Sequence, residues 1–357
     1  MTHQLDSRAT DHSDTKPTAL FIRATRSPGP PWWWRHLNHE SLGCRLVHEA
    51  ILLDGGRPSR VLSWPFIVMG LTAVRVLLRA RHRDVRYIFT VECDWLSFLI
   101  AGLQTLLMFR TPRHVIVQFI MRERTDAVRS RLKYAFMRWC FRSVHLSICS
   151  SRSEARYYAQ TFGWTTDKAA YVPILTDPSF IQRGAATEQG YVISAGRTFR
   201  DYDTLLEAFR ECPVPLRIVG TVESTIASTS IPRHVTLEGD VPLAELSQLM
   251  ARSLLVVLPL QDRQISIGQS VLLAAMAMGK AVIVTSVNGT VDYVEHMKTG
   301  ILVPPKDPKA IRDAVRLLMD DHDLRRRIGH AAREQVLREH LPDHYAQGIA
   351  RRLRAVR

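Results

Sequence analysis

At 357 residues, 46% of them hydrophobic, the chain is long enough for two domains with their own cores and has the composition of a globular protein. Its 48 basic residues against 34 acidic ones give a formal net charge of +14, which favours anionic partners such as phospholipid headgroups, nucleic acid or phosphorylated substrates. An arginine-rich composition with solvated faces explains the same surplus without any partner.

The cysteines and histidines indicate neither disulfides nor a structural zinc. The five cysteines are scattered without a Cys-x-x-Cys pair and mostly lie in apolar surroundings, which predicts buried thiols in a reducing cytoplasm. The 14 histidines show no metal-ligand spacing with cysteine or carboxylate. The cysteines are Cys44, Cys93, Cys140, Cys149 and Cys212.

The N-terminal part of the chain has the pattern of a parallel α/β domain. Residues 1–17 are polar, which predicts a flexible tail and not a signal peptide. From Thr18 to residue 172, short apolar runs alternate with helical stretches, as in a Rossmann-like domain. The predicted strands are 19–23, 60–63, 85–91, 114–119 and 144–149, and the predicted helices include 129–141 and 153–162.

Two apolar stretches, 61–78 and 95–109, raise the question of membrane spans. The first contains Pro65 and Arg75, and the second is too short to cross a bilayer comfortably. Buried helices of a sheet protein are therefore the favoured interpretation of both.

The segment 110–142 combines basic residues with large apolar ones. A basic helix with an aromatic edge suits a membrane interface, which predicts a cytoplasmic protein attached peripherally to anionic lipid on the inner face of the cell membrane. The basic residues are Arg110, Arg113, Arg122, Arg124, Arg129, Arg131, Lys133, Arg138 and Arg142, and the apolar ones are Phe119, Ile120, Met121, Tyr134, Phe136, Met137 and Trp139.

The alternation of strands and helices restarts after a break. Residues 173–190 contain Pro173, Pro178 and a polar Gly-Ala-Ala-Thr-Glu-Gln-Gly stretch, which predicts a linker. The second domain is expected at 191–338, with strands 192–195, 216–219, 235–237, 254–258, 281–284 and 301–303, and residues 339–357 form a separate C-terminal helix. The predicted fold class is α/β, with two Rossmann-like domains facing a cleft where ligands bind.

One segment of the second domain carries the strongest signal. Residues 266–280 read as a glycine-led loop and a buried helix that ends at Gly279, and a β-branched run returns as a strand. The free N–H groups at such a helix start can hold an anion such as a diphosphate. The segment resembles the nucleotide-sugar site of retaining glycosyltransferases of family 4 (glycosyl transferases group 1), which have the GT-B fold.

In that family the run is Glu-Gly-Phe-Gly, four residues, then Glu-Ala-Met-Ala-x-Gly. The resemblance implies that residues 266–270 bind the donor, through Ser266, Ile267, Gly268, Gln269 and Ser270. Ser266 and Ala274 occupy the positions of the family's two glutamates, which touch the donor sugar and the ribose. Ser266 can make one hydrogen bond there, and Ala274 can make none.

Other parts of the chain resemble the same family. Val172-Pro173, with Asp177 and Phe180, is similar to the family's interdomain motif, and Ser150 to Glu154 is similar to its serine-rich helix cap. The resemblance also implies that the C-terminal helix crosses back onto the first domain.

The segment Gly196 to Tyr202 resembles the family's Gly-Arg-Leu…Lys-Gly segment, whose cations neutralise the donor diphosphate. Arg197 matches the family arginine, and Arg200 stands in more loosely for the lysine. A surface arginine pair at a helix start is the alternative. Asp201-Tyr202-Asp203 imitates a metal-binding Asp-x-Asp motif, but its place at a helix start favours capping, so no essential metal or cofactor is expected.

Further site residues follow from the resemblance. Ser27, Gly29 and Trp32 lie in the loop that binds the acceptor in the family, and the tryptophans there suit sugar stacking, a membrane interface or simple packing. Gln118 stands where many members have a histidine; it can bond a sugar hydroxyl but cannot act as a base. Asn288 and Gly289 form a turn that either contacts the donor or is only a turn.

No Gly-x-Gly-x-x-Gly fingerprint, phosphate loop or nucleic-acid module occurs, which disfavours a dehydrogenase, an ATPase and a nucleic-acid-binding protein. The resemblance implies a hexosyltransferase-type enzyme of polysaccharide biosynthesis. It would transfer a sugar from a nucleotide-diphosphate sugar to a glycan or lipid-linked acceptor with retention and without metal. The alternative is a catalytically weak GT-B subunit that binds a ligand or partner in glycan assembly.

Overall fold

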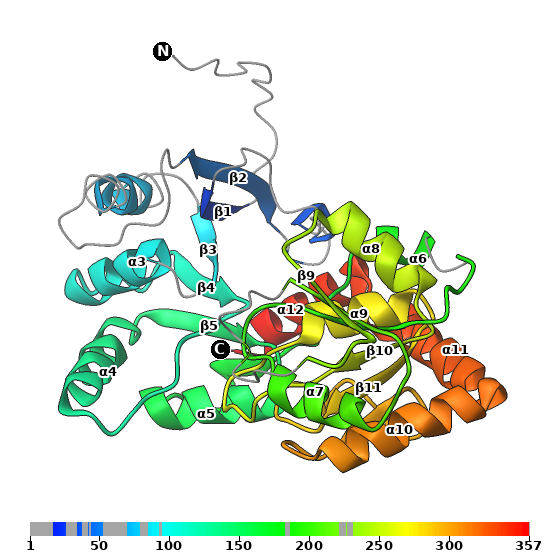
Figure 1. Ribbon diagram of the computed structural model, residues 1–357. Coiled ribbons are helices and arrows are strands. Elements are labelled where there is room, and N and C mark those ends of the chain that lie inside the picture. The colour runs from blue at the N-terminus through cyan, green and yellow to red at the C-terminus, as the bar shows by residue number, and fades with distance from the viewer. Residues whose placement is uncertain are drawn as a thin grey trace.

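The computed structural model of the chain describes residues 17–25, 34–37, 42, 44–52, 70–78, 85–92, 95–182, 186–220, 226 and 231–356. Two six-stranded sheets form its framework, in the orders β2-β1-β3-β4-β5-β6 and β12-β11-β10-β7-β8-β9 (Figure 1). Neighbouring strands pair in parallel in both sheets. The predicted α/β fold with two Rossmann-like halves is therefore confirmed.

The N-terminal half contains the first sheet and the helices that cover it. Its strands are β1 (Thr18–Thr25), β2 (Arg45–Leu52), β3 (Val85–Val91), β4 (Arg113–Val117), β5 (Val144–Cys149) and β6 (Ala169–Tyr171). Its helices include η1 (Trp34–His36), a helical stretch at 70–78, α3 (Trp95–Leu106), α4 (Val128–Cys140) and α5 (Arg152–Phe162).

The C-terminal half contains the second sheet. Its strands are β7 (Val192–Ala195), β8 (Leu216–Val219), β9 (Val235–Glu238), β10 (Leu255–Leu258), β11 (Ala281–Thr285) and β12 (Ile301–Val303). Its helices are α6 (Ser179–Gln182), α7 (Tyr202–Arg210), α8 (Leu243–Arg252), α9 (Gln269–Ala277), α10 (Pro308–Asp320), α11 (His322–Glu339) and α12 (Pro342–Ala355). Each strand of this sheet lies within one residue of its predicted bounds.

Two strands of the first sheet were not predicted. β2 carries His48 and Glu49 in the middle of its apolar residues, and β6 is only three residues long. Both are edge strands, where one side of the strand is unpaired and the hydrophobic pattern is weak. The strand predicted at 60–63 lies outside the described residues.

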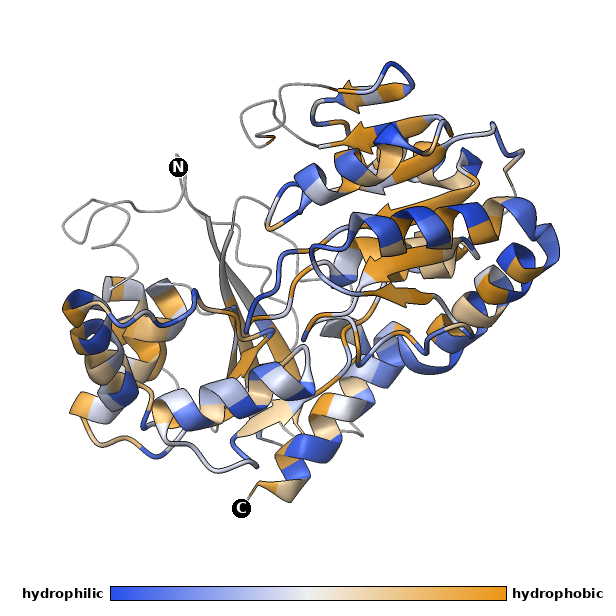
Figure 2. Ribbon diagram, turned by 60° about the horizontal axis from the view of Figure 1, so that its bottom comes forward, coloured by the Kyte–Doolittle hydropathy of each residue, from blue (hydrophilic) through white to orange (hydrophobic). Residues whose placement is uncertain are grey.

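The core lies between the sheets and their helices, and Figure 2 shows strands of the second sheet coloured as hydrophobic. The helix α9 is buried continuously from Leu272 to Ala277, as its apolar run predicts. Cys44, Cys140, Cys149 and Cys212 are buried free thiols, in agreement with the prediction, and Cys93 lies outside the described residues. Within the described part of the chain, no helix is both long and apolar enough to cross a membrane.

The C-terminal helix returns to the first half of the chain. Tyr345, Ile349 and Leu353 of α12 belong to the hydrophobic core beneath the first sheet. His36 Nδ1 lies 2.9 Å from Asp343 Oδ1 at the start of the helix. The predicted crossing is therefore present.

A buried histidine in the first sheet predicts acid sensitivity. Burial, aided by nearby Lys168, lowers the pKa of His114 to about 3, so His114 is neutral in the native protein. Its Nε2 lies 2.9 Å from Thr90 Oγ1. Below about pH 6.5 the unfolded chain binds a proton at this residue, and the native state does not. The free energy of unfolding therefore decreases as the pH is lowered, by up to about 1.4 kcal/mol per pH unit.

We expect urea unfolding between pH 7.5 and 5 to show this loss in the wild type. His114→Leu should flatten the slope, because no proton can then bind at this position, whereas His330→Asn at an exposed site should leave it unchanged. A slope that is the same in all three proteins would contradict the assignment.

Candidate functional site: the edge between the two sheets

Three loops of the C-terminal half meet at one edge of its sheet. They follow β7, β10 and β11, which are adjacent strands, so the loops 196–201, 259–268 and 286–290 are neighbours. Gln261 N donates to Phe199 O at 3.0 Å, and Asn288 Nδ2 donates to Arg263 O at 3.0 Å. The structure thus brings the three predicted donor-binding segments together.

The start of α9 presents unsatisfied N–H groups. Gly268 is its N-cap with φ 86°, no side chain caps it, and the first turn contains no acidic residue. A Cβ at Gly268 would lie 2.9 Å from Leu260 Cδ1, so the position requires glycine for both conformation and space. Ser270 in the first turn is exposed. Such a terminus is suited to binding an anion.

Ile267, Gln269 and Gly289 form the packed base of this helix start. Gln269 is buried and donates from Nε2 to Gly289 O at 2.9 Å. A Cβ at Gly289 would lie 2.8 Å from Ile267 N and 2.6 Å from Gln269 Nε2, so a larger residue would displace the turn. The predicted contacts of these residues with a donor stay predictions; their visible role is to fix the backbone around Gly268.

Arg197 lies on the loop after β7 with its side chain 64% exposed. Its Nη1 is 2.6 Å from Asp240 Oδ2, and Asp240 is itself 62% exposed. An ion pair this open to water contributes only about 0–1 kcal/mol, so an incoming phosphate can replace the carboxylate.

The guanidinium of Arg200 is hydrogen-bonded to backbone carbonyl groups. Its Nε donates to Ala195 O and its Nη1 to Thr198 O, both at 3.0 Å, and burial lowers its pKa. An antiparallel bridge between Arg200 and Leu260 turns the residue inward. The visible role of the guanidinium is to hold the backbone at the end of β7 and in the loop after it, and its predicted contact with a donor stays a prediction.

Arg263 was missed by the sequence analysis. Its guanidinium lies over the Phe199 ring, 4.7 Å from the centroid, and its Nη2 donates to Gln261 Oε1 at 3.0 Å. Its Nη1 is 3.4 Å from Glu123 Oε2 of the N-terminal half, and its buried Nε has no hydrogen-bond partner in the described structure. A cation is therefore positioned at the junction of all three loops. A lone arginine in a polar loop gave no motif by which to find it.

The N-terminal half contributes two residues in unusual backbone conformations. Gln118 follows β4 with φ 52°, and Glu92 follows β3 with φ 58°. Glu92 N donates to Val117 O at 2.9 Å, so the two residues are neighbours at the carboxyl edge of the first sheet. Left-handed backbone at non-glycine residues is strained and is concentrated at functional sites. Gln118 was predicted here, and Glu92 was not.

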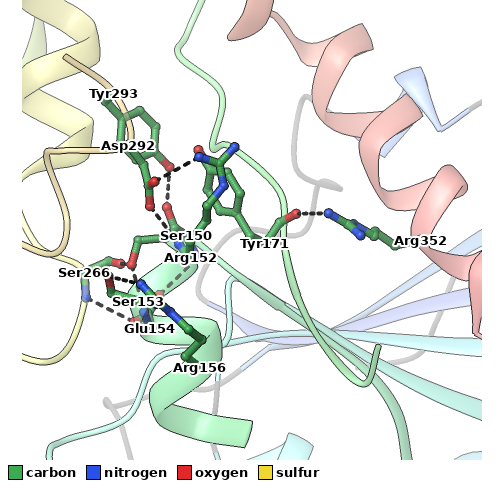
Figure 3. A network of polar contacts seen from close by, with 11 residues as sticks. Ser150, Arg152, Ser153, Glu154, Arg156, Tyr171, Ser266, Asp292, Tyr293 and Arg352 are labelled. Atoms are coloured by element: carbon green, nitrogen blue, oxygen red, sulfur yellow. Dashed lines mark hydrogen bonds and ion pairs between the residues drawn. The ribbon is translucent and has the colours of Figure 1, made fainter. Parts of the chain in front are cut away.

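A buried carboxylate joins this edge to the second half (Figure 3). Glu154 of α5 accepts from Ser150 N at 3.0 Å and from Ser266 N at 3.1 Å, and Ser266 Oγ donates to Ser151 Oγ at 2.8 Å. Burial raises the pKa of Glu154, and the N–H groups of Ser266 and Ser150 oppose that rise. Ser266, expected to touch the donor sugar, instead directs its hydrogen bonds to the N-terminal half.

A second set of contacts lies beside the first, as Figure 3 shows. Arg152 N donates to Asp292 Oδ2 at 2.7 Å, and Tyr293 OH donates to Ser150 O at 2.5 Å. The same hydroxyl accepts from Ile174 N at 3.1 Å. The carboxyl edges of the two sheets are thereby held face to face.

Two further predictions concern metals and the acceptor loop. Asp201 is the N-cap of α7 and accepts from Thr204 N, which confirms the capping interpretation. No group of three or more potential metal ligands occurs among the described residues. Ser27, Gly29 and Trp32 lie outside them, so their predicted contact with an acceptor stays a prediction.

We expect Glu154→Gln to lower the free energy of unfolding by about 1–3 kcal/mol, because one buried N–H would then face the amide NH₂. Urea unfolding of the variant measures the loss, with Glu334→Gln at an exposed position of α11 as control. Equal stabilities of the two variants would show that Glu154 does not bridge the halves.

Comparisons with known proteins show what the chain is similar to. Residues 177–335 match the family Glycosyl transferases group 1. A stretch of 111 residues is 32% identical to alpha-D-kanosaminyltransferase of Streptomyces kanamyceticus and covers 31% of this chain and 28% of that protein. A stretch of 67 residues is 39% identical to the capsular polysaccharide biosynthesis glycosyltransferase CapM of Staphylococcus aureus, covering 19% and 18%. The matched stretches span less than a third of either relative.

Solved structures match over nearly the whole chain. A glycosyltransferase from Rickettsia africae has a TM-score of 0.69 at 14% identity, covering 96% of this chain and 99% of that one. The Anabaena protein Alr3699/HepE in complex with UDP has a TM-score of 0.67 at 16% identity, covering 95% and 100%. The chain therefore has the GT-B fold, and its residues 177–335 match the glycosyl transferases group 1.

Proposed function

We propose that the protein is a glycosyltransferase of the hexosyltransferase type that uses a nucleoside-diphosphate sugar as donor and a glycan or lipid-linked acceptor in polysaccharide assembly. The observation that carries the proposal is the uncapped start of α9 at Gly268, next to the loops of Arg197 and Arg263 and opposite the edge of the first sheet. The similarity to structures described as complexes with UDP and UDP-glucose supports a uridine nucleotide as one candidate donor.

The donor diphosphate would lie against the first turn of α9. The N–H groups of this turn and the guanidinium of Arg197 provide positive charge for the leaving group, and Asp240 is displaced from Arg197 in the process. Arg263 takes the role that the sequence assigned to Arg200. These groups stabilise the developing charge electrostatically, so the proposal includes no metal ion.

Transfer would proceed with retention of configuration. The bond between the anomeric carbon and the diphosphate oxygen breaks, and the acceptor oxygen attacks the face that the diphosphate leaves. The acceptor hydroxyl proton passes to the departing diphosphate oxygen. Gln118 would bond a sugar hydroxyl on the acceptor side of the cleft, and its amide would not accept the proton.

A binding subunit without strong catalysis is the second candidate function. It is favoured by the engagement of Ser266 with Glu154 and Ser151, and by the buried methyl group of Ala274, which cannot hold ribose hydroxyls. The leaving-group cations are nevertheless present, so we infer an enzyme.

Titration calorimetry of the folded protein with UDP, GDP and ADP tests the donor site. We expect at least one nucleotide to bind, with heat of binding that is lost at high salt because phosphate contacts are screened. Absence of binding by all three would overturn the proposed function.

Arg197→Ala and Arg263→Ala should each weaken nucleotide binding by about 10- to 100-fold, since each removes a charged contact to phosphate. Arg326→Ala on α11 is the matched control, because that arginine is exposed and pairs only locally with Asp323. Sugar transfer should fall by orders of magnitude with Arg197→Ala. If cells with this variant make normal glycan while deletion of the protein abolishes it, the binding-subunit interpretation is correct.

A further inference from the structure

The outer side of α4 carries a row of exposed apolar residues. Val128, Leu132, Phe136 and Trp139 are 69%, 67%, 56% and 38% exposed. Their spacing of four, four and three residues places them on one side of the helix, within an arc of about 80°. A row of this length is not the scattered exposure of single apolar residues that protein surfaces normally show.

The packing of α4 uses Phe136 of this row and leaves Val128 and Leu132 the most exposed of the four. Tyr134 and Cys140, on other sides of α4, are buried, and the helix packs on α3 through the Phe136 and Phe98 rings, whose centroids are 5.8 Å apart. The Phe136 ring also stacks on Trp139 at 6.2 Å, which orders the exposed edge. The fold therefore buries one side of α4 and leaves an ordered apolar side uncovered.

Cations border the apolar row on both sides. At 100° per residue, Arg129 and Lys133 flank it on one side and Arg131 and Arg138 on the other, and all four are exposed. The sequence from Ala127 to Val144 contains no Asp or Glu. The neighbouring helix α3 runs into Leu106, Leu107 and Met108, which are 63%, 48% and 86% exposed.

We propose that α4 lies in the interface of an anionic lipid bilayer, with Val128, Leu132, Phe136 and Trp139 among the acyl chains and the flanking cations at the headgroups. An apolar helix side bordered by Lys and Arg has the chemistry of interfacial helices, and basic side chains add attraction to anionic lipid. A second copy of the chain would bring these cations against one another, and like charges repel.

The position of α4 relates this surface to the cleft. In Figure 1, α4 lies at the outer edge of the N-terminal half, away from the C-terminal half. The segment that joins β4 to α4 contains Gln118 and also Glu123, which accepts from Gln264 N at 2.6 Å. The membrane surface and the acceptor side of the cleft are therefore connected by ten residues, 118–127. This arrangement suits an acceptor that is itself anchored in lipid.

Flotation of the purified full chain with vesicles tests the proposal. Vesicles of phosphatidylcholine alone are compared with vesicles that also contain phosphatidylglycerol, at low and high salt. We expect recovery with the anionic vesicles only, reduced at high salt. Equal recovery with the neutral vesicles, or none with either, would overturn the proposal.

Two double variants separate the apolar contribution to vesicle binding from the electrostatic contribution. Val128→Ser with Leu132→Ser should weaken vesicle binding by about tenfold or more, and Arg131→Gln with Lys133→Gln by about tenfold or more, with the second effect largest at low salt. Leu243→Ser on α8, 61% exposed in the other half, is the control and should bind as the wild type. Should the double serine variant fail to fold, Leu132→Asn alone provides the same comparison.

Sedimentation of the same proteins tests whether a second copy of the chain, instead of lipid, covers this surface of α4. If the wild type is a dimer that Val128→Ser with Leu132→Ser converts to a monomer while vesicle binding is unchanged, the surface binds a second copy and the proposal is wrong. Nucleotide binding in solution should be equal in all these variants. A wrong membrane proposal can therefore be distinguished from a wrong proposed function.

Discussion

The buried carboxylate of Glu154 is the interaction on which the geometry of the cleft depends. It accepts one N–H from its own half and one from the loop before α9, and a carboxylate is the side chain that can accept at both oxygens without offering a hydrogen in return. Burial disfavours its charge and raises its pKa, and the two N–H groups offset part of that cost. The start of α9 is thereby fixed against the edge of the first sheet.

This bridge also gives a physical reason for the serine at position 266. A glutamate there, as in the resembling family, would place a second carboxylate beside buried Glu154, and like charges in so dry a place repel strongly. A small hydroxyl instead donates to Ser151 and leaves Glu154 its two N–H partners. In this chain, the residue that position 266 can hold therefore depends on the carboxylate at 154.

The sequence was sufficient to predict those helices and strands whose hydrophobic pattern depends on local residues alone. The strands β10 and β11 are nearly continuous apolar runs, and α9 is apolar from Val271 to Ala277, so their bounds follow from composition. β2 and β6 were missed because edge strands carry polar residues or are short. Among the site residues, Gly268 and Asn288 follow from turn chemistry. Arg263 and Glu154 do not, because their roles depend on contacts over 140 and 112 residues of chain, respectively.

The net charge of +14 can be interpreted only when the partners of each cation are known from the structure. On α10 and α11, cations pair with neighbouring acids, as Lys309 does with Asp313 and Arg326 with Asp323. Arg200 is taken up by carbonyl groups of its own loop. On α4 the cations have no acidic residue within the helix itself, the nearest in the chain being Asp126 before its start, and they border an exposed apolar row. With four cations and no carboxylate between residues 128 and 140, α4 is a helix whose surroundings must supply the negative charge.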